Sequence, residues 1–132
     1  MNKEQTKMKK HILTYLILIV MSIFLVACNS DSSSEEEIQI KITLYDEVND
    51  STIASDEFDA KDGQILQEVL EANYEVEVQQ GGFITSIEGH QQNEADSIFW
   101  VYEVNGEEVH EAASNYELQE NDDVLFKLMQ FE

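Results

Sequence analysis

The residues best suited to chemistry in this sequence are aromatic side chains that alternate along one predicted strand. Trp100 and Tyr102 lie two positions apart, so they share one face of that strand, and the opposite face carries Phe99 and Val101. If the opposite face points into the interior, Trp100 and Tyr102 lie on an open face, where a planar organic ligand or a protein partner could stack. In the alternative arrangement, Trp100 packs in the core and Tyr102 borders it.

No set of side chains has the spacing of a catalytic centre. Serines gather in residues 30–34, where no partner is expected. His90 and His110 lie in or beside predicted loops, and nothing at a fixed spacing supplies a nucleophile and a base. The only cysteine, Cys28, is expected to be modified and so offers no reactive thiol. We therefore expect a non-enzymatic protein with no cofactor of its own.

Oxygen ligands for a metal ion are plentiful, but they lack the pattern of a calcium loop. Acidic and amide side chains gather at residues 56–59 and at residues 121–123. Neither group has the central glycine and terminal glutamate of an EF-hand loop. Solvated acidic turns are commoner than metal sites, so we predict no metal site, although the sequence leaves calcium binding by these turns open.

The N-terminal residues predict an export signal that ends at a lipid-modified cysteine. Residues 1–11 carry four lysines and one acid, and residues 12–27 are almost wholly apolar. Sixteen apolar residues are fewer than the roughly 20 of a membrane-spanning helix, which favours a signal peptide over an uncleaved membrane helix. Residues 25–28 resemble the lipobox of bacterial lipoproteins. That resemblance implies cleavage before Cys28 and lipidation of its thiol, which would hold the protein on the extracytoplasmic face of the cell membrane.

The rest of the chain divides into a tether and one domain. Residues 28–37 are expected to form a flexible tether, because Asn29 to Glu37 contains no apolar residue that could offset the entropy of ordering. Residues 38–132 are numerous enough for a single domain. That domain contains no cysteine, so its stability must come from its core and not from disulfides.

The charge of the chain excludes one class of partner. From Cys28 onward there are three lysines and 27 acidic residues, which gives a net charge of −24. A surface of this sign repels nucleic acid and anionic lipid headgroups. Nucleic acid is therefore not expected as a partner. The acidity itself is explained more simply by solubility at a crowded surface, or by adaptation to salt, than by an acidic binding site.

The strand that carries Trp100 is expected at the centre of a sheet. It spans Ser97 to Val104 and runs into Asn105-Gly106, a strong hairpin signal. Segments 83–88 and 124–131 have strand composition, so each could pair with it. Further strands are predicted where apolar residues alternate at 38–44, more weakly at 52–58, and as a short return at 107–110. Turns or loops are predicted at the remaining polar stretches, residues 46–51, 79–82, 89–96, 112–116 and 120–123.

One helix is predicted between these strands. Apolar residues recur at helical spacing from Gln64 to Tyr74, with Leu70 near the middle of the stripe, and Asp62 is the expected N-cap. A hairpin, a helix and then several strands, with no repeated βαβ unit, favour an α+β fold. We predict a β-grasp-like mixed sheet with one packed helix, preceded by a signal peptide and a flexible tether.

The order of these motifs resembles the transcobalamin-like C-terminal domain family, which is common in Gram-positive lipoproteins. The resemblance covers about Ile38 to Glu132 and rests on Trp-x-Tyr-x-x-Asn-Gly at residues 100–106, followed by Tyr116 and an acidic turn. The helix at 63–70 and the segment 82–89 agree with it. Where many members have Gly-Asp in the last turn, this sequence has Asn121-Asp122.

The resemblance implies a fold and a class of function. It implies a ligand-binding module, with a corrinoid (cobalamin-like) or other small molecule as ligand, and it adds Asn105 and Tyr116 to Trp100 and Tyr102 as candidate ligand-binding residues. Asn105 is more simply explained as a turn residue. His90 or His110 as an axial ligand to a corrinoid cobalt is a further option, although exposed loop histidines are commoner. The alternative function is a cell-surface protein-interaction or adhesion module that uses the same aromatic face.

Overall fold

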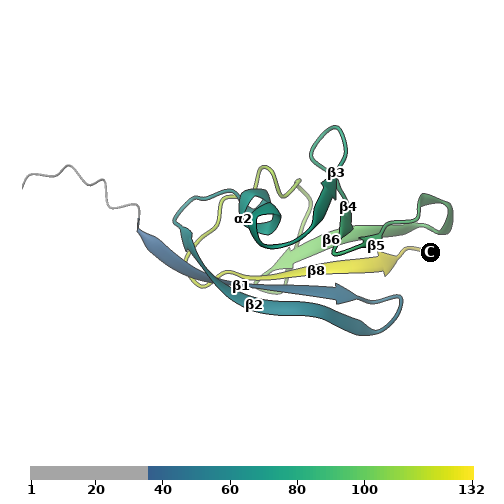
Figure 1. Cartoon of the computed structure of the whole chain (residues 1–132), viewed down its shortest axis with the longest axis horizontal. Coiled ribbons are helices and arrows are strands. Elements are labelled where there is room, and N and C mark those ends of the chain that lie inside the picture. Colours follow the sequence, from purple (N-terminus) through teal and green to yellow (C-terminus); the bar gives the residue numbers. More distant parts are fainter. Residues whose placement is uncertain (1–35) are drawn as a thin grey trace, which may run out of the picture. The chain divides into compact units, whose positions relative to one another are not determined.

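A computed structural model describes residues 36–132, which form an α+β domain (Figure 1). The predicted signal peptide, Cys28 and nearly all of the predicted tether lie outside these residues. Within residues 36–132, no helix is long and apolar enough to cross a membrane.

A five-stranded mixed sheet forms the base of the domain. Its order is β2 (Ser51–Lys61), β1 (Glu37–Asp46), β8 (Asp123–Gln130), β6 (Ile98–Val104) and β7 (Glu107–Val109). The β1 and β8 strands are parallel, and every other neighbouring pair is antiparallel. The predicted mixed sheet is therefore present, and the weakly predicted second strand is a full partner of the first.

The centre of this sheet is β8, so the prediction of a central β6 was wrong. Strand β6 pairs with β8 on one side and with β7, the edge strand, on the other. The Asn105-Gly106 turn joins β6 to β7 as predicted, with φ values of 53° and 80°. Composition identified β6 and β8 as strands, but strand order depends on contacts between distant residues that composition does not contain.

A second, three-stranded sheet consists of β3 (Val76–Val78), β4 (Ile84–Ile87) and β5 (His90–Gln91). The segment predicted at 83–88 is thus a strand, but it pairs with β3 and β5 and not with β6. The loop predicted at 89–96 instead contains β5 and a 3-10 helix, η1 (Glu94–Asp96). Glu88 and Gly89 both have positive φ and form a tight β4–β5 turn like that of Asn105-Gly106.

The helix, α2 (Leu66–Asn73), lies on the same side of the large sheet as the small sheet (Figure 1). It is shorter than predicted, and Asp62 is not its N-cap: Ile65 takes that position and makes no side-chain capping bond. Backbone carbonyls of a later loop replace the cap. The amide of Leu66 donates to the Tyr116 carbonyl at 3.0 Å, and the amide of Gln67 donates to the Ala113 carbonyl at 3.1 Å.

The core lies between the large sheet and the elements that cover it. Leu66 and Leu70 of α2 and Ile87 of β4 are fully buried in one cluster with the inward face of the large sheet. On β6 this inward face carries Tyr102 and Val104, which are opposite the buried Phe126 and Val124 of β8. The arrangement with Trp100 and Tyr102 on an open face is therefore wrong, and their face points into the domain.

Candidate functional site

A hollow of about 210 Å³ opens beside Trp100, although the face of β6 that lines it points inward. It is lined by β6, by β7 and the loop that follows it, and by residues 82–84, which lead into β4. Its wall is mainly apolar, and its principal side chains are Phe83, Trp100, Tyr102, Val109, Ala112 and Phe126. The structure thus places two of the four predicted ligand-binding residues in one concave surface.

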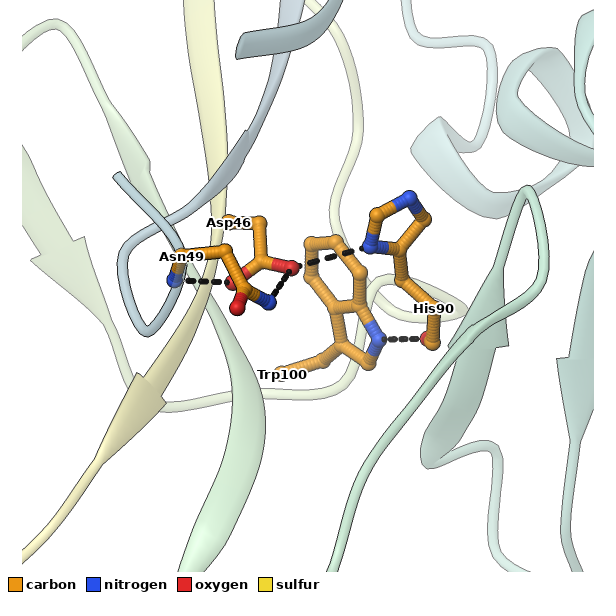
Figure 2. A network of polar contacts seen from close by, with 4 residues as sticks. All are labelled: Asp46, Asn49, His90 and Trp100. Carbon is orange, nitrogen blue, oxygen red and sulfur yellow. Dashed lines mark hydrogen bonds and ion pairs between the residues drawn. The ribbon is translucent and has the colours of Figure 1, made fainter. Parts of the chain in front are cut away.

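Trp100 is held in place by a hydrogen bond to the small sheet. Its indole Nε1 donates to the backbone carbonyl of His90 at 2.9 Å (Figure 2). The side chain is partly buried, and it also lines a second hollow of about 370 Å³. The two hollows share Phe83, Ile84 and Trp100. The indole therefore borders both hollows and has its one polar group satisfied within the protein.

Tyr102 lines the first hollow as part of the domain core. Its ring is 5% exposed and stacks on Phe126 with centroids 5.1 Å apart. Its hydroxyl donates to the carbonyl of Glu111 at 2.9 Å, which ties β6 to the loop that closes the hollow. Burial raises the pKa of this phenol above its ordinary value. Tyr102 therefore offers a ligand an aromatic surface and not a free acid.

Phe83 is the most exposed large apolar side chain of the site and was missed as a site residue from the sequence. It is 60% exposed and borders both hollows. It follows Gly82, which has a φ of 79° and lies so close to the 112–114 loop that a Cβ there would be 2.6 Å from Ser114 Oγ. An aromatic residue directly after Gly-Gly is the available signal, but composition alone predicts only the start of a strand there.

Asn105 and Tyr116, the other two predicted ligand-binding residues, do not line these hollows. Both bind Asp122, which is 4% exposed: Asn105 Nδ2 donates to Oδ1 at 3.0 Å, and the Tyr116 hydroxyl donates to Oδ2 at 3.0 Å. Burial and this hydrogen bond raise the pKa of Tyr116 to about 12. These hydrogen bonds hold the turn before β8, and the Tyr116 ring also packs edge-on against Tyr102, with centroids 6.2 Å apart.

A second buried carboxylate, Asp46, supports the Trp100 side of the site. Asp46 is 1% exposed and accepts a hydrogen bond from His90 Nδ1 at 2.9 Å (Figure 2). Asn49 donates to it through its backbone amide at 3.0 Å and through Nδ2 at 2.7 Å. Burial alone would raise the pKa of Asp46, but the hydrogen bonds from Asn49 and His90 lower it overall. No local sequence pattern predicts the contact with His90, because the two residues are 44 positions apart.

The polar groups of the site do not form a metal centre. Among residues 36–132, no group of three or more His, Cys, Asp or Glu side chains is arranged to hold a metal ion. Of the two histidines considered as cobalt ligands, His110 lines the first hollow, whereas one ring nitrogen of His90 is bound to Asp46. His110 therefore lies at the hollow, whereas the His90 side chain belongs to the network around Asp46.

The sequence from Gly63 to Gln130 matches the model of a family described as "Domain of unknown function (DUF4430)". This match covers more than half of the chain. The chain belongs to that family. The matched segment contains every residue that lines the two hollows, whereas Asp46 and the β1–β2 hairpin precede it. A comparison with curated proteins found no match.

Two solved structures have a similar fold. One is of a protein of Ruminococcus gnavus described as a proposed metal binding protein, with 24% identity and a TM-score of 0.62 over 73% of this chain and all of that one. The other is haptocorrin in complex with Cbi, with 18% identity and a TM-score of 0.64 over 80% of this chain. This chain spans only 29% of haptocorrin. The domain thus has the transcobalamin-like fold that the sequence motifs predict.

Proposed function

We propose that this domain is a non-enzymatic module that binds a small organic molecule in the hollow beside Trp100. The observation that carries the proposal is the concave aromatic wall formed by Phe83, Trp100 and Tyr102. Small-molecule sites are typically concave and mainly apolar, with a few polar groups that fix orientation. The first hollow is small by that standard, but the larger second hollow shares Phe83 and Trp100 with it, so one planar ligand could cover both.

A corrinoid is the first ligand to test. Haptocorrin, whose structure contains Cbi, supports this choice through its similar fold. Isothermal titration of the full chain with cobalamin and with cobinamide should give saturable heat, and Phe83→Ala should weaken binding because it removes the exposed part of the aromatic wall. Val48→Ala is a matched control, since Val48 is also exposed but lies outside both hollows. Absence of heat with both corrinoids would reject the corrinoid and leave other small molecules to be tested.

A protein-interaction or adhesion module is the second candidate, and the exposed Phe83 ring favours it. Exposed apolar patches often mark protein contacts, but such patches tend to be flat. The concavity beside Trp100 favours the small molecule. A surface protein that bound the chain and lost affinity in Phe83→Ala, together with no small-molecule binding, would reverse this order.

We also propose that the domain is a lipoprotein, anchored by Cys28 to the extracytoplasmic face of the cell membrane. The support is the basic and apolar N-terminal sequence that ends in a lipobox-like segment. Cys28→Ser should release the protein from the membrane fraction or leave an unprocessed precursor, as judged by fractionation and gel mobility. Ser30→Ala is the control and should change neither. Normal processing with full membrane retention in Cys28→Ser would contradict lipidation.

A further inference from the structure

The first hollow combines its apolar wall with an acidic side chain at its opening. Glu111, in the loop after β7, lines the hollow and is exposed. After burial, the charge of Glu111 is the next cause of the raised pKa of the Tyr102 phenol, so its carboxylate acts on the aromatic wall. Glu108 of β7 also borders the hollow, but it pairs with Glu103, and its side chain shares the outward face of the sheet with that of Glu103. Glu94 lines the second hollow. A ligand that covers the aromatic wall would therefore come close to carboxylates at the opening of either hollow.

The lysines of the domain do not balance these carboxylates. Residues 36–132 contain three lysines, and neither hollow is lined by any of them. Lys127 pairs with Glu103, and both side chains alternate with the inward-facing residues of their strands. Lys41 lines a different hollow, beside Asp122 and Asp123. The only basic side chain that lines the hollows is His110, in the first. The local charge therefore repeats the negative sign of the whole domain.

We infer that the ligand of this hollow is an organic cation, with an apolar ring that rests on the aromatic wall and a positive group that faces Glu111. This inference rests on the proposed small-molecule function and adds the charge of the ligand to it. The carboxylates attract a cation and repel an anion, and a concave wall of low polarity strengthens both effects. Aromatic rings also attract cations through their π faces.

Three probes of nearly equal size test the inference: 4-ethylbenzylamine, which is an ammonium ion at pH 7, 4-ethylbenzyl alcohol and 4-ethylbenzoate. Trp100 is the only tryptophan, so its fluorescence, excited at a wavelength that the probes do not absorb, reports binding directly. The full chain in liposomes is titrated at low and high salt, with protein-free liposomes as the blank. We expect the ammonium ion to bind about threefold to tenfold more tightly than the alcohol, and the benzoate to bind most weakly.

Charge-neutral variants assign the preference to the hollow. Glu111→Gln should reduce the preference for the ammonium ion about twofold, without weakening the binding of the alcohol. Glu108→Gln is the matched control, because Glu108 is also exposed but its side chain lies on the outward face, opposite Glu103. Phe83→Ala should weaken the binding of the ammonium ion and of the alcohol to the same extent. High salt should reduce the preference.

The outcomes separate this inference from the proposed function. Equal binding of the three probes, or tightest binding of the benzoate, would overturn the inference that the ligand is a cation. The proposal that the hollow binds a small molecule would still stand. An equal effect of Glu111→Gln and Glu108→Gln would also overturn the inference of a cation, because the overall charge would then account for the preference. Binding of no probe, together with no corrinoid heat, would overturn both.

Discussion

Two buried aspartates hold opposite ends of the large sheet in different ways. Asp122 precedes β8, and Asp46 ends β1 beside Leu128, near the other end of β8. Each carboxylate accepts three hydrogen bonds. Those of Asp122 come from Asn105, Tyr116 and the amide of Gln119. Those of Asp46 come twice from Asn49 and once from His90.

The partners of the two aspartates differ in their distance along the chain. The donors to Asp122 lie within 17 residues of it, in the β6–β7 turn and in the loop that precedes β8. One donor to Asp46 is an imidazole 44 residues away, whose own backbone carbonyl binds Trp100. The Asp122 network therefore fixes local turns, whereas the Asp46 network fixes the small sheet beside the hollow.

Both ends of the large sheet rest on one shared core, so Leu70→Ala should have the largest effect on stability. Leu70 is fully buried, so its loss should reduce the free energy of unfolding by about 2–5 kcal/mol. Urea unfolding followed by Trp100 fluorescence and by far-ultraviolet circular dichroism should give one coincident transition. The exposed Glu71→Ala is the control. Two separate transitions would mean that the ends unfold independently.

Asp122→Ala should have the next largest effect. It leaves three donors without their acceptor, and an unsatisfied buried donor costs about 1–3 kcal/mol. We expect a loss of about 2–4 kcal/mol, because water in the adjacent hollow can reach part of the site. Trp100 emission of the folded protein should not change. Asp123→Ala is the control, since Asp123 is exposed and its backbone amide keeps its bond to Asn105.

His90→Gln should reduce stability less than Asp122→Ala does, but it should change the environment of Trp100 in the hollow. Losing the bond to Asp46 should reduce the free energy of unfolding by about 1 kcal/mol. Because the His90 carbonyl binds the indole, Trp100 emission should shift in the folded protein. His110→Gln, which leaves this network intact, should shift neither stability nor emission by a comparable amount. A shift in Asp122→Ala and none in His90→Gln would reverse the roles assigned to the two ends.

The smallest expected effect is a dependence on acid pH that comes from Asp46. Its pKa is lowered in the folded state, so its stabilising contribution is present above the unfolded pKa of about 4 and is lost as the pH falls through the folded value. Between pH 5 and 2, Asp46→Asn should therefore lose less stability than the parent chain in urea unfolding. Asp59→Asn, an exposed control, should follow the parent. Parallel curves for all three would exclude Asp46 as a source of acid sensitivity.

The sequence predicted the elements governed by neighbouring residues. Alternation from Ile38 to Leu44, the helical stripe around Leu70 and the Asn105-Gly106 turn all depend on short-range patterns, and all three are present. The helix start was misplaced because loop carbonyls took the place of the Asp62 side chain. A local reading could not include carbonyls that lie about 50 residues away.

The candidate site was only partly predictable for a related reason. Alternation shows that Trp100 and Tyr102 share a face, but it does not decide which face is buried; pairing with Phe126 and Leu128 of β8 decides that. The position of the Phe83 side chain depends on the close approach of Gly82 to Ser114. The Asp46–His90 contact joins the β1–β2 hairpin to the β4–β5 hairpin. These features come from tertiary contacts that no short window of the sequence contains.

The central position of β8 also affects the order in which the domain can assemble. The β1–β2 hairpin and the β6–β7 hairpin meet only through β8, which is the last strand of the chain. A polypeptide synthesised or exported from its N-terminus can form either hairpin early, but the large sheet cannot close until residues 123–130 emerge. Removing that one C-terminal strand would therefore split the sheet into two separate ribbons.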